Sequence, residues 1–280
     1  MIGKSYEGRD LKVFVIGPNP QKKVVWVDGG HHAREWISPA TAMFIATTLA
    51  TNKAACDSGS NECNHDINRL LNTFEFRILP IVNPDGYEFS QTSDRMWRKT
   101  RSDSGLTPWS IFCKGTDPNR NYEAKWGGEG SSGNPCSQTY AGRKPHSEPE
   151  VTSLTDHVLS IRSRILLFVS LHSYSQIMLL PYGHSEDVPT EYPEIEKLAM
   201  IGAQVFKSRG TDYKVGSAAK ILYPASGTAS DWAFDQGIKY AYTFELPDTG
   251  DEGFLLPSER IKPVGEETWL ALQAMLTSLL

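Results

Sequence analysis

The stretch Gly29-Gly30-His31-His32-Ala33-Arg34-Glu35-Trp36 follows the apolar run Val24-Val25-Trp26-Val27 and is typical of a strand that ends in a polar site. An imidazole and a carboxylate three residues apart, His32 and Glu35, can both reach one divalent cation. Three protein ligands and one water form the usual shell of a catalytic zinc ion. His172, after a second strand-like run, is the best candidate for the third ligand. A His-x-x-Glu pair alone is more often part of a solvated turn, so the interpretation depends on the remaining sequence.

Composition limits the class of protein. With 280 residues, of which 39% are hydrophobic, the chain can bury one sizeable core, and one large α/β domain fits better than two small ones. A formal net charge of -5 and the absence of long Lys/Arg clusters argue against a general nucleic-acid or anionic-membrane binder. No apolar run approaches the roughly 20 residues of a membrane span. The first residues, Met1 to Ser5, lack the apolar core of a secretion signal.

The four cysteines form two local pairs within polar loops, Cys56 with Cys63 and Cys113 with Cys136. This placement predicts two disulfides that staple loops in an oxidising, extracellular compartment. Four free thiols are the alternative, although isolated cysteines are more often buried in regular elements. A zinc site made of all four is less consistent with the sequence, because neither pair has Cys-x-x-Cys spacing.

Several elements can be expected from local signals in the first half of the chain. Apolar runs at 11–17 and 23–28 predict an antiparallel hairpin. Ser38 is expected to cap a helix that has Pro39 at its first position and continues through Ala50, with Met43, Ile45 and Leu49 buried. The pattern then predicts, in order, a helix at 66–71, a strand at 74–79 and a turn at Asn83-Pro84-Asp85-Gly86.

The second half begins with a long segment, 87–143, that has no clear periodicity. We expect it to be irregular, and loops of such length in a compact domain are usually functional. Ser147-Glu148-Pro149-Glu150 has the pattern of a capping box that opens a helix to about Ile161. The remaining expected elements are strands at 164–171, 177–181 and 240–245 and helices at 194–208, 257–261 and 266–280.

The candidate chemical residues share one kind of position. His32 and Glu35 follow a strand, His172 follows another, and Glu245 ends a third. In open α/β sheets the binding crevice lies at the carboxyl ends of the strands. We therefore expect these four side chains to form one site.

Taken together, the ordered motifs resemble the zinc carboxypeptidases of the A/B type. The matching motifs are Gly29 to Trp36, Asn83-Pro84-Asp85-Gly86-Tyr87, Arg95-Met96-Trp97-Arg98-Lys99-Thr100-Arg101, Pro118-Asn119-Arg120-Asn121, His172-Ser173-Tyr174-Ser175, Tyr223 to Gly227, Thr243-Phe244-Glu245 and Gly253 to Pro257. The resemblance extends from Ile2-Gly3 to the C-terminal helix. It implies one catalytic domain over 1–280, with a central mixed twisted β-sheet flanked by helices and a zinc site at the carboxyl ends of strands.

The resemblance also implies the roles of the catalytic residues. His32, Glu35 and His172 would bind one zinc ion, whereas His31 is the variable neighbour in the motif and no ligand. Glu245 resembles the general base, which takes a proton from the zinc-bound water as that water attacks the peptide carbonyl. Arg98 matches the residue that stabilises the developing oxyanion.

Substrate selection follows from further matches. Asn119 and Arg120 match the pair that holds the terminal carboxylate of the substrate, for which a bidentate guanidinium is suited. Tyr223 resembles the mobile phenol that closes over the bound residue. The remaining matches, at outer subsites and packing positions, are Arg34, Arg101, Tyr174 and Phe254.

The pocket for the C-terminal side chain of the substrate is expected to be lined mostly by small, uncharged residues. Its expected lining comprises Leu179, Gly183, Ala218, Leu222, Ala225, Thr228, Ala229, Ser230 and Thr243. Ser230 matches the base of the pocket, where B-type enzymes place an acid for Lys or Arg side chains and typical A-type enzymes place an apolar residue. A neutral pocket favours aliphatic and aromatic C-terminal residues. B-like or mixed preference is the alternative.

The resemblance leaves other expectations open. The start of the chain departs from full-length relatives, which carry a secretion signal, an inhibitory pro-segment and an opening helix and strand, so the chain is expected to be a fragment or truncated form with some sheet surface uncovered. Cys56 and Cys63 are outside the pair found throughout the family. The expected partners are peptide or protein C-termini and the pro-segment of the precursor, with no nucleic acid and no membrane, and a secreted monomer is expected. The rival interpretations are an inactive C-terminus-binding homologue and a zinc amidohydrolase acting on small acylated amino acids.

Overall fold

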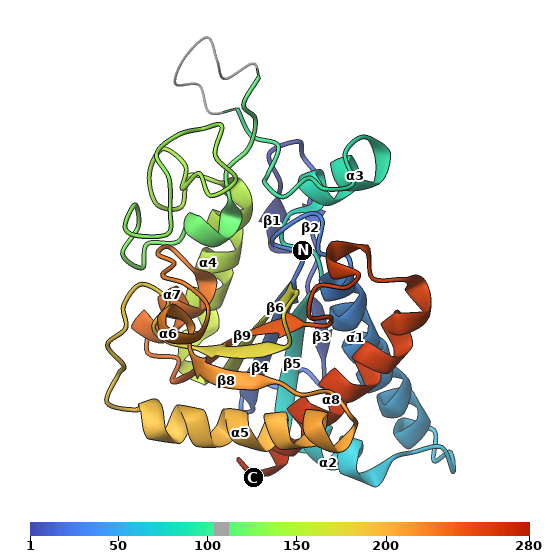
Figure 1. Ribbon diagram of the computed structural model, residues 1–280. Coiled ribbons are helices and arrows are strands. Elements are labelled where there is room, and N and C mark those ends of the chain that lie inside the picture. The colour runs from blue at the N-terminus through green and yellow to red at the C-terminus, as the bar shows by residue number, and fades with distance from the viewer. Residues whose placement is uncertain (104–111) are drawn as a thin grey trace.

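The computed structural model describes residues 1–103 and 112–280 and has a seven-stranded mixed sheet at its centre (Figure 1). The strand order is β3-β5-β4-β6-β9-β7-β8. The strands are β3 (Phe14–Ile16), β4 (Lys23–Gly29), β5 (Phe74–Leu79), β6 (Ile165–Ser173), β7 (Ile177–Leu180), β8 (Lys214–Ser217) and β9 (Tyr240–Leu246). Strands β5, β4, β6 and β9 run parallel, whereas β3 and β7 are antiparallel to β5 and β9.

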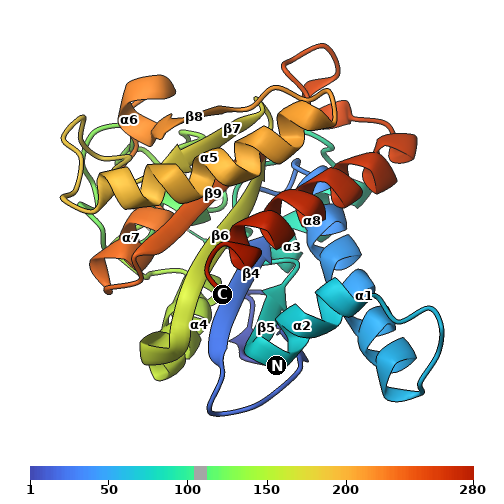
Figure 2. The same cartoon turned by 90° about the horizontal axis from the view of Figure 1, so that it is seen from below.

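Helices cover both faces of this sheet (Figure 2). One layer comprises α1 (Ile37–Asp57), α2 (His65–Thr73), α5 (Tyr192–Ser208) and α8 (Ile261–Thr277), and the other contains α4 (Pro149–Ile161) and α7 (Ala229–Asp235). Because side chains alternate along a strand, Val25 and Val27 of β4 pack in the first layer and Val24 and Trp26 in the second. Alternation therefore gives the expected α/β fold two cores, one on each side of the sheet.

Shorter elements complete the chain. A two-stranded sheet, β1 (Gly3–Lys4) with β2 (Asp10–Leu11), lies beside α4, and α3 (Pro84–Thr92) follows β5. The helix α6 (Ala218–Ile221) follows β8. Single 3-10 turns are found at Pro118–Arg120, Arg162–Arg164, Gly253–Leu255 and Ser258–Arg260. Across the described residues, no helix is both long and apolar enough to cross a membrane.

The expected hairpin of 11–17 with 23–28 is wrong. Strand β3 pairs with β5 instead, and β5 separates it from β4. The reason is burial: β4 is buried along most of its length and takes parallel partners on both edges, whereas Phe14 and Val15 of β3 are exposed, as suits an edge strand.

The expected cap at Ser38 is also wrong. Helix α1 begins at Ile37 without a side-chain cap and continues past Ala50 to Asp57, and Met43 on it is exposed. The Ser38 hydroxyl instead accepts the Gly30 N–H at 2.9 Å and donates to the Leu171 carbonyl at 2.5 Å. It therefore ties the end of β4 to β6 rather than satisfying the first turn of its own helix.

Three other boundaries differ from expectation. Asn83 caps a helix, α3, because its side chain accepts the Gly86 N–H, so the expected turn is the start of a helix and the segment 87–143 is not wholly irregular. Glu148, not Ser147, is the N-cap residue of α4. The helices expected at 257–261 and 266–280 are one 3-10 turn followed by the single helix α8.

The structure also contains elements that the sequence did not predict, and it contains both predicted disulfides. The elements β1, β2, β8, α6 and α7 were not anticipated, and residues 104–111 of the expected irregular segment lie outside the described residues. Both expected disulfides are present, Cys56–Cys63 across the loop after α1 and Cys113–Cys136 across 23 positions.

Candidate active site

The site lies where three neighbouring parallel strands end. Strands β4, β6 and β9 are adjacent, and their register places Gly29 opposite Leu171 and His172 opposite Glu245. After β4 the chain turns at Gly30, whose φ of +67° is one that L side chains rarely adopt. A Cβ at this position would also lie 3.1 Å from the Pro80 carbonyl oxygen. This turn directs His32 and Glu35 back over the end of β6.

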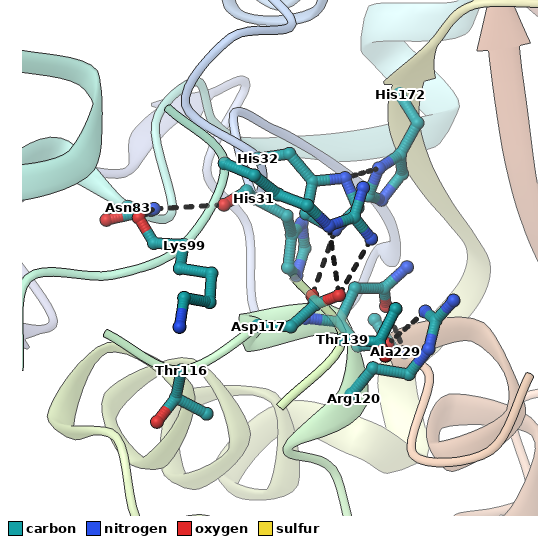
Figure 3. A network of polar contacts seen from close by, with 12 residues as sticks. His31, His32, Asn83, Lys99, Thr116, Asp117, Arg120, Thr139, His172 and Ala229 are labelled. Atoms are coloured by element: carbon teal, nitrogen blue, oxygen red, sulfur yellow. Dashed lines mark hydrogen bonds and ion pairs between the residues drawn. The ribbon is translucent and has the colours of Figure 1, made fainter. Parts of the chain in front are cut away.

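His32, Glu35 and His172 converge in the buried part of the site, and Figure 3 shows the two imidazoles side by side. His32 Nδ1 lies 2.6 Å from Glu35 Oε1, and His172 Nδ1 lies 3.1 Å from Glu35 Oε2 and 3.2 Å from His32 Nδ1. Bonds of 2.0–2.1 Å to a tetrahedral zinc ion imply spacings of roughly 3.3 Å between ligand atoms. The two imidazole nitrogens and one carboxylate therefore fit a zinc ion in both chemistry and spacing.

The charge states of these groups also suit a metal. Burial favours the protonated form of Glu35, yet the imidazoles of His32 and His172 outweigh burial and hold the pKa of Glu35 below its usual range. Burial lowers the pKa of His172. Glutamate binds a metal as the carboxylate and histidine binds it as the neutral imidazole, because the ligand atoms must be deprotonated.

Asp117 is a site residue that the sequence interpretation missed. Figure 3 shows Asp117 beside His32, and its Oδ1 lies 3.0 Å from His32 Nε2. The other oxygen, Oδ2, accepts from Arg98 Nη2 at 2.7 Å and from Arg98 Nε at 3.1 Å. Burial disfavours the charged form, but Arg98 and His32 together hold the pKa of Asp117 well below its usual range. The available signal was its position directly before Pro118, where an Asp caps the turn by accepting the Asn119 N–H.

A cavity of about 230 Å³ opens above these residues. It is lined by His32, Arg34, Glu35, Arg98, Asn119, Arg120, Ser173, Tyr174, Ser175, Leu179, Ala218, Leu222, Tyr223, Ala225, Thr228, Ser230, Thr243, Glu245 and Phe254. His172 is buried and is not among the residues that line the cavity. The structure thus brings the candidate metal, catalytic and substrate-binding residues to one place.

Glu245 and Arg98 carry the charges nearest to the chemistry. Burial raises the pKa of Glu245 well above its usual range and the Glu35 charge adds to the rise, whereas the guanidiniums of Arg98 and Arg120 oppose it. For Arg98, burial is outweighed by Asp117 and Glu35, and its pKa is raised. A carboxyl group that binds a proton more tightly than usual and a fixed cation therefore border the same cavity.

The pair Asn119 and Arg120 is held by backbone contacts. Asn119 Oδ1 accepts the Ala229 N–H at 2.9 Å, which leaves the NH₂ group of the amide available to the cavity. Arg120 donates from Nε to the Gly130 carbonyl at 2.9 Å and from Nη1 to the Asn119 carbonyl at 2.8 Å. These contacts fix a planar cation and an amide donor side by side.

The outer part of the cavity is aromatic and cationic. The Arg34 guanidinium lies over the Phe254 ring at 4.2 Å, and Tyr174 meets the same ring edge-on at 4.9 Å. Tyr223 is 51% exposed, so the phenol has room to move. Arg101 does not line the cavity, and its guanidinium packs over Phe89 and Trp97.

The inner pocket matches most of the expected lining. At its base the Thr243 hydroxyl donates to Ser230 Oγ at 3.1 Å, and both side chains are buried. Two expected residues are not part of the wall. Ala229 is buried behind Asn119, and the Gly183 N–H donates to the Asp231 carboxylate. The expected lining residues that border the cavity carry no charge, and the Asp231 carboxylate, which is not among the lining residues, accepts from the N–H groups of Gly183 and His184.

Comparisons with known proteins agree with this geometry. The family model described as "Zinc carboxypeptidase" matches residues 1–271. Carboxypeptidase A2 of Mus musculus is 47% identical over 98% of this chain and 63% of its own length, and carboxypeptidase B of Astacus astacus is 41% identical over 96% and 85%. The chain thus spans less than two thirds of the length of the first of these relatives. Among solved structures, bovine thrombin-activatable fibrinolysis inhibitor in complex with tick carboxypeptidase inhibitor superposes with a TM-score of 0.89 at 38% identity, covering 99% of this chain and 88% of that one.

Proposed function

The chain belongs to the zinc carboxypeptidase family, and on that premise we propose that it is a zinc-dependent exopeptidase that removes single C-terminal residues from peptides. One observation carries the proposal. The cluster of His32, Glu35 and His172 lies beside the same cavity as Glu245 and the carboxylate-binding pair Asn119 and Arg120. Metal chemistry and C-terminus recognition would therefore act on one bound peptide.

His32, Glu35 and His172 would hold the zinc ion. Zinc bound there would polarise the scissile carbonyl and lower the pKa of a water molecule. Asp117 orients His32 through its Nε2–H, so that His32 Nδ1 faces the metal position. One ion per chain follows from one three-residue cluster among the described residues.

Glu245 would act as the general base. Its carboxylate borders the cavity, where it can take a proton from the attacking water and deliver that proton to the leaving amine. Arg98, held by two hydrogen bonds to Asp117, would stabilise the charge that develops on the carbonyl oxygen. A guanidinium fixed in advance requires little reorganisation during the reaction.

Selection of the C-terminus would depend on Asn119 and Arg120. A guanidinium and an amide donor side by side suit the two oxygens of a free carboxylate, and an internal peptide bond offers no such charge. Tyr223 would close over the bound residue, while Arg34, Tyr174 and Phe254 would contact residues further from the end of the peptide.

The side-chain pocket supports a preference for aliphatic and aromatic C-terminal residues. In this proposal its base is formed by Ser230 and Thr243, whose hydroxyls are hydrogen-bonded to each other and carry no charge. A cationic substrate head would lose its hydration there without gaining a counter-charge. Secretion is part of the proposal and is supported by the two disulfides. A monomer with an inhibitory pro-segment in its precursor is proposed from family membership.

The test measures release of the last residue from N-blocked dipeptides that end in Phe, Leu or Arg, each also as its C-terminal carboxamide. We expect release of Phe and Leu to exceed that of Arg, the carboxamides to resist cleavage, and a chelator to abolish release until zinc is restored. Faster Arg release would indicate B-like preference. Preferred hydrolysis of acylated amino acids would indicate an amidohydrolase, and zinc binding without any cleavage an inactive C-terminus-binding homologue.

A further inference from the structure

The imidazole of His172 has a second polar contact on the side that faces away from the candidate metal position. Its Nε2 lies 3.2 Å from Ser170 Oγ, and that hydroxyl lies 2.7 Å from Asp28 Oδ1. The other Asp28 oxygen accepts the Trp26 Nε1–H at 2.7 Å. All four side chains are buried.

The register of β4 with β6 places these residues next to one another. Ser170 and His172 are two residues apart on β6 and so point to the same face, and Asp28 of β4 is the direct register partner of Ser170. The geometry is therefore set by the two central strands of the sheet and not by a loop.

The proton positions in this series of hydrogen bonds follow from which groups can donate and which can only accept. Burial raises the pKa of Asp28 to about 7, although the hydrogen bonds from Ser170 and Trp26 oppose the rise. Once Asp28 is ionised, its carboxylate oxygens only accept, so the single proton of the Ser170 hydroxyl is directed to Asp28. The remaining lone pairs of Ser170 Oγ can then accept from His172 Nε2–H, which is closer than His31 Nδ1. A proton on Nε2 leaves the Nδ1 lone pair of a neutral imidazole directed at Glu35 and His32, where the metal would bind.

A third imidazole closes the cluster. His31 stacks on His172 at 5.2 Å, and its Nε2 is 2.8 Å from the Tyr122 hydroxyl. His31 Nδ1 lies 3.5 Å from both Ser170 Oγ and Asp28 Oδ1, further than the contacts that these two atoms already make. His31 and Tyr122 are both fully buried, so these neighbours of the Ser170 contacts are themselves inaccessible to solvent.

We propose that Ser170 and Asp28 are positioning residues of the metal centre, which fix the tautomer and ring orientation of His172 as Asp117 does for His32. The inference rests on the proposed zinc site, since without a metal the tautomer of His172 has no function to serve. Partners of this kind typically alter metal affinity 10–100-fold when they are removed.

The most informative variant is Asp28→Asn, which keeps the shape of the side chain. Its amide oxygen must accept the Trp26 N–H, so its NH₂ group faces Ser170 and the hydroxyl proton turns toward His172 Nε2. That arrangement requires the proton on Nδ1, and a protonated Nδ1 cannot bind zinc. Ser170→Ala instead removes the acceptor and leaves Nε2–H without a partner.

The test compares zinc dissociation constants, measured by competition with a chromophoric chelator, for the unmodified chain, Asp28→Asn and Ser170→Ala. Thr155→Val is the matched control, because it removes a buried hydroxyl that is bonded only within α4. Visible absorption of the cobalt-loaded proteins reports the ligand geometry, and melting of the metal-free proteins reports folding.

We expect both variants to weaken zinc binding at least 10-fold, Asp28→Asn by at least as much as Ser170→Ala, with altered cobalt spectra, and the control to bind as the unmodified chain does. Folded variants that bind zinc with the unmodified constant would overturn the inference and leave the proposed function intact. An unmodified chain that binds no zinc would overturn both.

Discussion

Asp117 shows how closely single residues are linked in this site. One oxygen faces His32 and the other holds Arg98, so a single carboxylate orients a candidate metal ligand and the cation beside it. Ser230, in contrast, is hydrogen-bonded to the neutral hydroxyl of Thr243. It is small and neutral, and at the proposed base of the pocket the charge of this residue would determine which substrate side chain fits. Substitution at Ser230 should change selectivity without disturbing the metal ligands.

We predict that Ser230→Asp reverses the side-chain preference. A buried carboxylate without a counter-charge costs free energy, and a bound Arg or Lys head would supply that counter-charge. The ratio of kcat/KM for Arg over Phe substrates should rise at least tenfold, mostly through poorer use of Phe. Ser230→Ala, which adds no charge, is the control. An unchanged ratio in Ser230→Asp would show that this position does not form the base of the pocket.

At this scale the sequence predicted the ligand candidates because they carry their signal locally, as His32 and Glu35 are three residues apart beside a strand. Asp117 and Ser170 carry no such signal. Their contacts join residues 85 and 142 positions apart. The Ser170 contact depends on the register of β4 with β6, whereas Asp117 precedes a 3-10 turn whose place beside His32 is set by the tertiary fold.

At the scale of single elements, helix α4 has a buried carboxyl group, that of Glu150, in its first turn. Glu150 in its first turn accepts the Tyr6 N–H through Oε1, while Oε2 is buried without a hydrogen-bond partner in the part of the chain that the structure describes. Burial raises the pKa of Glu150 to about 7. The N-terminal segment that carries Tyr6 is therefore attached to α4 through a group that titrates near neutral pH.

We predict that Glu150 makes stability depend on pH. Because its pKa is higher in the folded state than the ordinary value of 4.5 for a glutamate, folding takes up a proton between pH 4.5 and about pH 7. Its contribution is most favourable below pH 4.5 and is lost as the pH rises through about 7, by roughly 3 kcal/mol. Glu150→Gln should remove this part of the slope in urea unfolding measured between pH 5 and pH 8. Parallel slopes for both proteins would contradict the prediction.

The two disulfides should differ in what they contribute. In the chain-entropy model the bridge across the longer loop constrains the unfolded state more, so replacing Cys113 and Cys136 by Ser should cost about 3.5 kcal/mol and replacing Cys56 and Cys63 about 2.5 kcal/mol. Urea unfolding of each double variant measures the cost. A larger loss from the Cys56–Cys63 pair would contradict this order.

Elements were predicted well where apolar periodicity is strong, as in β5, β6, α5 and β9, and less well where a polar residue could act in two ways. Ser38 and Asn83 both suit helix starts and turns, and tertiary contacts decided between these roles. Ser38 binds across to Leu171, whereas Asn83 caps the helix that follows it. Local sequence patterns could not predict the order β3-β5-β4. Strands β3 and β4 are consecutive in the sequence, but β5, which follows much later in the chain, lies between them in the sheet.

The whole molecule is a sheet whose central parallel strands end at one site. Two of the three candidate ligands follow β4 and the third ends β6, so metal binding would join the two central strands of the sheet. Any ligand that binds only the folded state stabilises it.

We predict that removal of zinc lowers the stability of the entire fold. At free zinc a thousandfold above its dissociation constant, the stabilisation should be about 4 kcal/mol, seen as a higher melting temperature in calorimetry. Glu35→Gln, which lacks one ligand charge, should lose most of this response. Equal melting temperatures with and without zinc in the unmodified chain would contradict a metal site shared by the two strands.

The central claim, that a metal cluster and Glu245 together hydrolyse C-terminal peptide bonds, is tested most directly by one comparison. Zinc-loaded unmodified chain and Glu245→Gln would be assayed for release of Phe from an N-blocked dipeptide, with zinc content determined on the same samples. The account predicts one zinc per chain in both proteins and a loss of release of at least a thousandfold in the variant. Similar release by both proteins would contradict it.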